Sequence, residues 1–167
     1  MSQSPERVKD LEPPDGLEDL IGGRSEASIR RQISSLYFSI INYWGAILLY
    51  KHGLDAESLY LKHVFPAQID SEKKSQLKLY PDNFRIIDLE SELRTALNYR
   101  LNPEIEKVSR LRVACDHRLN NPATIKVNKR IGISSPDLLE VNETRLEQAK
   151  VAFKKIIEEI NLVENIS

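Results

Sequence analysis

The sequence predicts an all-α fold, an antiparallel bundle of about five helices. Apolar residues recur at spacings of three and four along several segments, no long segment alternates apolar with polar residues, and prolines and glycines fall between the periodic segments. With 167 residues, 41% of them hydrophobic, the chain can bury a core without disulfides. We expect one helical domain over residues 25–167. Residues 1–24, which are acidic and contain several prolines and glycines, are expected to form a flexible arm.

The strongest helical pattern starts at Ser25 and continues to Gly53. Its apolar positions are Ile29, Ile33, Leu36, Tyr37, Ile40, Ile41, Trp44, Ile47 and Leu48. Phe38 and Tyr43 lie off this stripe, so the segment carries more aromatic surface than one face can bury inside its own bundle. This surplus predicts a symmetric homodimer.

Shorter patterns predict two helices in the middle of the chain. The first is expected from Asp55 to about Phe65, where Pro66 ends it. The apolar positions of the second are Phe84, Ile87, Leu93 and Leu97.

The next helix is expected to start at Asn102 and Pro103 and to end at residues 120–122, which read Asn-Asn-Pro. Its buried stripe is expected to contain Ile105, Val108, Leu111, Cys115 and Leu119.

A loop over residues 123–134, with a short extended piece over 124–127, is expected to precede the last helix. Ser135 and Pro136 have the order of a helix cap and a first helical residue, so we expect that helix to begin there. Its apolar positions are Leu146, Ala149, Phe153, Ile156, Ile160 and Val163.

Cysteine and histidine usage gives no sign of a metal site. Cys115 is the only cysteine, which excludes an intrachain disulfide and a cysteine-based zinc site. The three histidines form no short ligand pattern, so we expect neither a metal nor a cofactor. No apolar run approaches the roughly 20 residues that span a bilayer, and the start of the chain is acidic. These features predict a cytoplasmic protein without membrane contact.

The segment from Lys107 to Arg130 is strongly basic and carries the candidate site. It has seven basic residues and one acid, a charge of +6 in a chain whose net charge is -1. Such asymmetry favours a confined anionic partner. Within it, Arg112 and His117 offer a group that binds phosphate and a group that transfers protons near neutral pH.

Two structural interpretations of these residues stay open beside the functional one. Arg112 and Asp116 have the spacing of an ion pair on one helix, and His117 has the place of an exposed histidine in a last turn. In a regular helix His117 lies about 140° from Arg112 and about 20° from Arg110. We therefore expect Arg112 and His117 to meet one phosphate only across two chains.

Two segments resemble those of HEPN domains. The stretch 34–53, with the run Leu36-Tyr37-Phe38 and a later Gly-Ala-Ile-Leu-Leu, looks like the long aromatic helix of that family. Leu111-Arg112 followed by Asp116-His117 is similar to a later HEPN helix, where an arginine precedes a histidine or tyrosine at a fixed distance. The resemblance covers about Ser25 to Asn121 and implies a small helical bundle that dimerises.

The resemblance implies a metal-independent endoribonuclease, often a toxin, with Arg112 and His117 in a cleft between protomers. Arg110 is the alternative arginine, and Asn42 stands where many relatives have histidine. The supporting or substrate-binding residues would be Asp116, Arg110, Arg118, Lys126, Lys129, Arg130 and Asn42. The other hypothesis is a non-catalytic module that binds RNA or a nucleotide, or acts as a scaffold. Either form implies a possible partner, a minimal nucleotidyltransferase.

Overall fold

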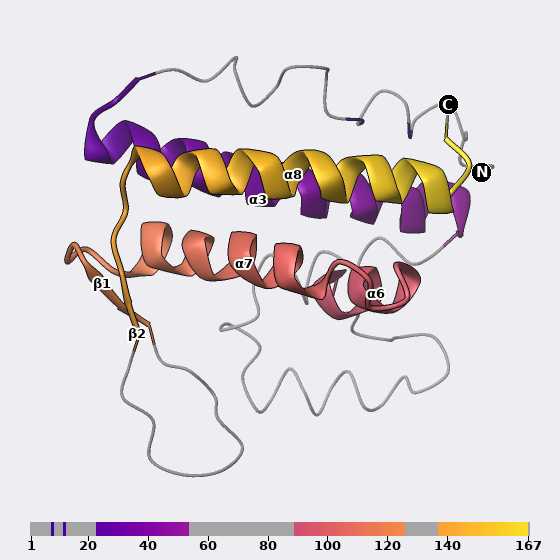
Figure 1. Ribbon diagram of the computed structural model, residues 1–167. Helices are drawn as coiled ribbons and strands as arrows, with labels where there is room; N and C mark the ends of the chain where they lie inside the picture. Colours follow the sequence, from indigo (N-terminus) through magenta and orange to yellow (C-terminus); the bar gives the residue numbers. More distant parts are fainter. Residues whose placement is uncertain (1–7, 9–11, 13–22, 54–88, 126–136, 167) are drawn as a thin grey trace, which may run out of the picture. The chain divides into compact units, whose positions relative to one another are not determined.

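The computed structural model describes residues 8, 12, 23–53, 89–125 and 137–166, which are mostly helical, as predicted. They form two compact units. Unit 1 comprises Met1–Glu12 and Ile41–Tyr99, and unit 2 comprises Pro13–Ile40 and Arg100–Ser167. In chain order the elements are α3 (Glu26–Ala46), η1 (Ile47–Lys51), α6 (Leu89–Ala96), α7 (Asn102–His117), β1 (Ala123–Ile125), β2 (Asp137–Leu139) and α8 (Glu143–Val163) (Figure 1).

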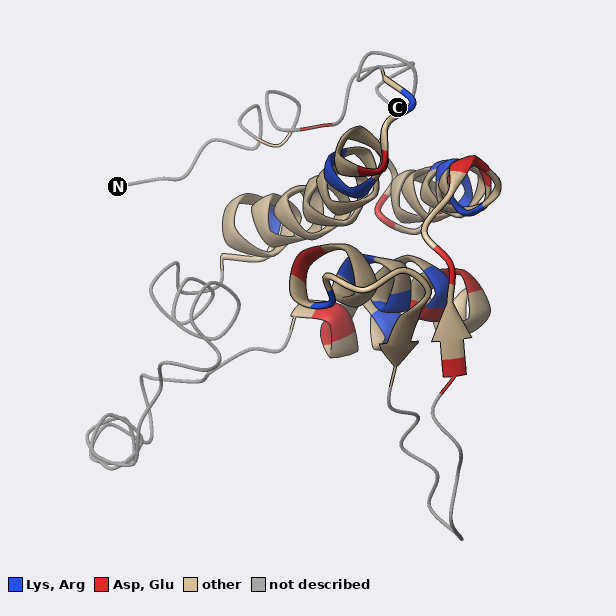
Figure 2. Ribbon diagram, turned by 90° about the vertical axis from the view of Figure 1, so that its left-hand side faces the viewer, with Lys and Arg blue, Asp and Glu red and all other residues tan. Residues whose placement is uncertain are grey.

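The core of unit 2 lies between α7, α8 and residues 26–40 of α3. Figures 1 and 2 show these helices side by side, with α7 running opposite to the other two. The buried side chains include Ile29, Ile33, Leu36 and Tyr37 on α3, Val108, Leu111, Ala114 and Cys115 on α7, and Leu146, Ala149, Phe153, Ile156 and Ile160 on α8. Burial along one face of a helix requires this spacing of three and four, so the predicted stripes are confirmed at these positions except Ala114, which was not predicted.

The C-terminal end of α7 is held by an arginine of α3. The Arg30 side chain is only 11% exposed. Its Nη1 donates to the carbonyl oxygens of Ala114 at 2.8 Å and of Arg118 at 2.6 Å. The last carbonyls of a helix lack partners within the helix, and a cation there complements the helix dipole. With its end fixed in this way, α7 stops at His117. The prediction that Leu119 is buried is wrong: it lies beyond the helix and is 90% exposed.

Between α7 and α8 in the sequence, the chain forms a two-stranded antiparallel sheet. Ala123 pairs with Leu139 and Ile125 with Asp137, and the side chains of Ala123 and Ile125 are buried. Strand β1 thus covers part of the extended piece predicted over residues 124–127.

The predicted start of the last helix at Ser135 and Pro136 is wrong, because Asp137 to Leu139 form strand β2. Helix α8 begins instead at Glu143. The Asn142 side chain accepts a hydrogen bond from the backbone N–H of Arg145 at 3.0 Å. This cap satisfies one of the donors that a helix leaves open at its start.

Unit 1 contains η1, α6 and the C-terminal end of α3. Leu89, Leu93 and Leu97 are buried, the last two as predicted. Tyr43 is completely buried, although it was expected to be surplus to the fold. The π-helical turn η1 follows directly on α3 and ends near Gly53, whose φ of 70° lies in the left-handed region that favours glycine.

Several predictions fall wholly or partly on residues outside the described ranges. They are the helix over 55–65, the apolar positions 84 and 87, the loop over 126–134 and most of the arm over 1–24. Of the arm, residues 8, 12, 23 and 24 are described, and Val8 is buried.

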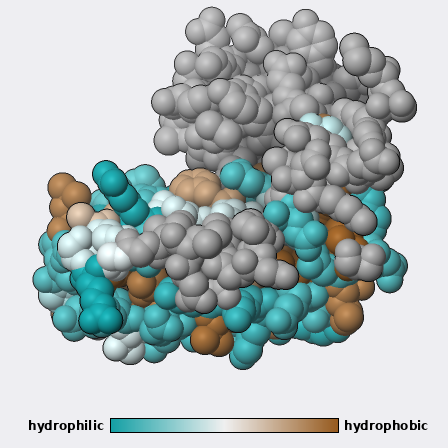
Figure 3. All heavy atoms as spheres, turned by 90° about the horizontal axis from the view of Figure 1, so that it is seen from above, coloured by the Kyte–Doolittle hydropathy of each residue, from teal (hydrophilic) through white to brown (hydrophobic). Residues whose placement is uncertain are grey.

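One helix has the length and composition of a membrane span, whereas the sequence was expected to contain none. α3 and η1 together run for 26 residues, with a mean hydropathy of 1.3 in the best window, and 56% of that window is buried inside the protein. Core helices of globular proteins meet the same two criteria. On the face in Figure 3, the described surface is mostly hydrophilic with scattered hydrophobic groups.

The Arg30 contact predicts a large effect of one substitution. Arg30→Met keeps the aliphatic stem but leaves carbonyls of α7 without a donor, so we expect unit 2 to lose about 2 to 3 kcal/mol of stability. Urea unfolding followed by circular dichroism measures this loss. Arg31→Met, at the exposed neighbouring position, is the control and should change the midpoint little. Equal midpoints for the two variants would contradict the assigned role of Arg30.

Candidate functional site

Arg112 lies on α7 against two aromatic side chains of α3. Its guanidinium carbon is 4.7 Å from the ring centroid of Tyr37 and 5.8 Å from that of Phe38. The two rings meet edge to face, with centroids 5.4 Å apart. A guanidinium at this distance from a ring is attracted by the negative face of the π system. Tyr37 and Phe38 therefore form an aromatic platform that holds the arginine.

Arg112 and His117 meet within one chain. Arg112 Nη1 lies 3.2 Å from His117 Nε2. The prediction that they can converge only across two chains is wrong. That prediction considered only the directions in which the two side chains leave the helix. The arginine side chain is long enough to reach around the helix to His117, which is exposed at the last residue of α7.

The contact sets a condition on the histidine ring. A guanidinium has only donors, so Nε2 must accept, which requires the neutral ring with its proton on Nδ1. In that arrangement the Nε2 lone pair is occupied by Arg112, so His117 can act as a general base only after Arg112 has released it.

No carboxylate in the described part of the chain pairs with Arg112. Its Nε is buried and has no hydrogen-bond partner. The predicted pair with Asp116 is not formed, and the Asp116 carboxylate accepts a hydrogen bond from Ser34 Oγ at 3.2 Å instead. Among the described residues, Arg112 is therefore a half-buried cation in contact with two rings and an imidazole nitrogen, without a carboxylate partner.

The alternative arginine has a different environment. Arg110 Nη2 lies 2.7 Å from the Asp137 carboxylate of β2, so its charge is balanced. Of the two arginines, Arg112 is thus the one that meets His117 and keeps an open charge. Arg118, the residue after α7, has an exposed side chain and gives its carbonyl to Arg30.

The remaining predicted residues lie outside the described part of unit 2. Asn42 is exposed and belongs to unit 1. Lys126, Lys129 and Arg130 lie outside the described residues. In the part of the chain that the structure describes, no group of three metal-ligating side chains occurs.

Sequence reasoning missed the roles of four residues in the site. Arg30 fixes the end of α7, Ser34 holds Asp116, and Tyr37 with Phe38 supports Arg112. The sequence did contain one indication of these roles. Arg30 and Ser34 are next to buried residues of α3, and a polar side chain in such a position needs a partner on a neighbouring helix. Comparisons with models of protein families, with curated proteins and with solved structures found no match to this chain.

Cys115 lies between Arg112 and His117 in the sequence, but its thiol is unreactive. Its side chain is buried, and this burial raises the pKa of the thiol from 9.0 to about 12, against the opposing charge of Arg30. The thiolate is the nucleophilic form of cysteine, so at neutral pH this group is inert.

The raised pKa of Cys115 predicts a specific pH dependence of stability. The folded chain holds the thiol proton more tightly than the unfolded chain does. Its contribution to stability is therefore complete below pH 9.0 and is lost as the pH rises toward about 12. We expect the stability of the native chain relative to Cys115→Ala to shrink above pH 9.0. Urea unfolding of both proteins at several pH values tests this, and a constant difference would contradict it.

Proposed function

We propose that the chain is a HEPN-like protein that binds RNA through unit 2, with Arg112 and His117 forming a metal-independent endoribonuclease site. One observation carries the proposal. A half-buried arginine has no carboxylate partner among the described residues and lies on an aromatic platform, 3.2 Å from a histidine nitrogen. Phosphate binding, proton transfer and base stacking are the chemistries that these three groups supply.

The proposed cleavage begins when a phosphate oxygen replaces His117 as the acceptor for Arg112. This exchange frees Nε2 of the histidine, which takes the proton of the adjacent ribose 2′-hydroxyl. The 2′-oxygen forms a bond to phosphorus, and the bond from phosphorus to the 5′-oxygen breaks. The histidine returns its proton to that leaving oxygen. Arg112 stabilises the charge that accumulates on the phosphoryl oxygens.

The setting of this activity is proposed from the HEPN resemblance. It is a cytoplasmic homodimer, of the toxin type, with a minimal nucleotidyltransferase as a possible partner. Phe38, which is 38% exposed, provides apolar surface on the aromatic helix for a second protomer or for a base. With Tyr43 buried inside its own chain, less aromatic surface is left for a dimer than the sequence suggested.

A second candidate function is a non-catalytic module that binds RNA or a nucleotide. The observation that favours it is the contact of Arg112 Nη1 with the nitrogen that a base would use. In addition, His117 is the one histidine of the motif and must serve as both base and acid. In this alternative the pair binds a phosphate and no bond is cleaved.

The catalytic proposal predicts cleavage of single-stranded RNA by the purified full chain in the presence of a chelator. Arg112→Ala and His117→Ala should each lower the rate about 100-fold or more, because each removes a group that acts in the transition state. Arg110→Ala is the matched control, since it removes the same charge from the same helix, and it should retain activity. Gel-based cleavage assays on folded variants measure the rates.

Persistent cleavage by both single variants would reject the catalytic site. If the native chain binds RNA without cleaving it, and Arg112→Ala alone loses the binding, the non-catalytic module is the correct function.

Mixed dimers test where the site is built. Because Arg112 and His117 meet in one chain, a dimer of one Arg112→Ala chain and one His117→Ala chain contains no complete pair. We expect such heterodimers, purified with two affinity tags, to stay inactive. Recovery of about half the native rate would show instead that the two residues act across the protomers.

A further inference from the structure

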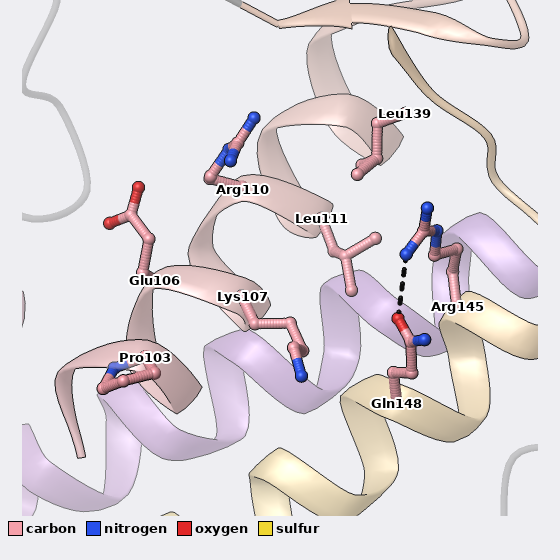
Figure 4. A pocket seen from close by; sticks show the side chains of 8 residues that line it. All are labelled: Pro103, Glu106, Lys107, Arg110, Leu111, Leu139, Arg145 and Gln148. Atoms are coloured by element: carbon pink, nitrogen blue, oxygen red, sulfur yellow. Dashed lines mark hydrogen bonds between the residues drawn. The ribbon is translucent and has the colours of Figure 1, made fainter. Parts of the chain in front are cut away.

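A second basic site lies on another side of α7, between α7, α8 and β2. It is a pocket of about 260 Å³. Lys107, Arg110 and Leu111 line it from α7, Arg145 and Gln148 from α8, and Leu139 from β2 (Figure 4). Neither Arg112 nor His117 is among its lining residues, so this inference does not depend on the proposed function.

Some of the charged side chains around the pocket have a partner of opposite charge, and others do not. Arg110 is balanced by Asp137. Arg145 donates from Nη1 to the neutral Gln148 Oε1 at 3.1 Å, the bond drawn in Figure 4, and pairs with no carboxylate among the described residues. Lys107 also has no ion pair within the described part of the chain. Glu106 is the one carboxylate in the lining, and it is exposed. Two cations therefore stay open toward one pocket.

The position of Arg145 raises the positive potential further. It lies in the first turn of α8, where the helix dipole already favours negative charge, so the arginine and the dipole add. The remaining donors of its guanidinium are suited to a bidentate contact with an oxyanion. Leu111 and Leu139 give the same pocket an apolar wall.

We propose that this pocket binds a phosphate monoester. The dianion matches the two open cations Lys107 and Arg145, and the apolar wall accepts the carbon skeleton next to it. Ligand pockets for drug-sized molecules measure about 300 to 1,000 Å³, so this smaller space fits a phosphate with part of a sugar. The ligand is either a small molecule such as a nucleoside monophosphate or the 5′-phosphate of an RNA.

Titration calorimetry of the full chain with adenosine monophosphate and with inorganic phosphate tests the proposal. We expect saturable binding of both, and none of adenosine. Lys107→Gln and Arg145→Gln should each weaken the binding about tenfold, the loss of one charge-assisted hydrogen bond. Lys107 is exposed, so its substitution leaves the fold intact.

The control is Lys155→Gln, which removes the same charge from a residue of α8 outside this pocket and should bind like the native chain. An equal loss in Lys155→Gln would overturn the proposal, because it would show attraction by net charge alone. Absence of saturable binding by the native chain would overturn it as well.

The two ligand sources are separated with oligoribonucleotides that carry a 5′-phosphate or a 5′-hydroxyl, bound to the His117→Ala chain to prevent cleavage. A preference for the phosphorylated end that Lys107→Gln abolishes identifies an RNA terminus. Equal binding of the two oligonucleotides, together with binding of adenosine monophosphate, identifies a small molecule. Failure of every phosphate monoester rejects the pocket and leaves the RNase proposal untouched.

Discussion

The candidate site depends on the hydrogen bonds that the Arg30 guanidinium donates to carbonyl oxygens at the end of α7. It reaches across from α3 to carbonyl groups of Ala114, Cys115 and Arg118, and its Nη2 lies 3.4 Å from that of Asn120. These groups belong to the last turn and to the chain that leaves it, so the contact determines where the helix stops. The same contact ties the His117 end of α7 to the helix that carries the aromatic platform. A site that combines α3 and α7 needs this fixed relation.

The basic side chains between Lys107 and Arg130 differ in whether a carboxylate pairs with them, which their number alone does not reveal. From the sequence, Lys107, Arg110 and Arg112 look equivalent, and together they contribute to one window of +6. In the structure Arg110 is neutralised by Asp137, whereas Arg112 and Lys107 have no carboxylate partner among the described residues. Arg112 and Lys107 lie on different sides of α7, and each belongs to one of the two separate anion sites that we propose.

The sequence predicted the helix cores well and the contacts between helices poorly. The stripe of Val108, Leu111 and Cys115 follows from the helical period alone, because burial of one face imposes it. The ends of helices depend on particular partners: Asn142 caps α8, and Arg30, far away in sequence, ends α7. The meeting of Arg112 with His117 depends on side-chain length and rotamer, which a helical projection does not contain.

The environment of Arg112 gives little net stability. A buried donor without an acceptor, such as its Nε, costs about 1 to 3 kcal/mol, and contact with an aromatic ring offsets about 0.5 to 2 kcal/mol. A methionine or leucine over the rings of Tyr37 and Phe38 would fill similar space without the unsatisfied donor. Residues that break a local rule without structural gain concentrate at functional sites. Asp116, four residues after Arg112 on α7, pairs with Ser34, and Arg112 has no carboxylate partner among the described residues, as the proposed phosphate site requires.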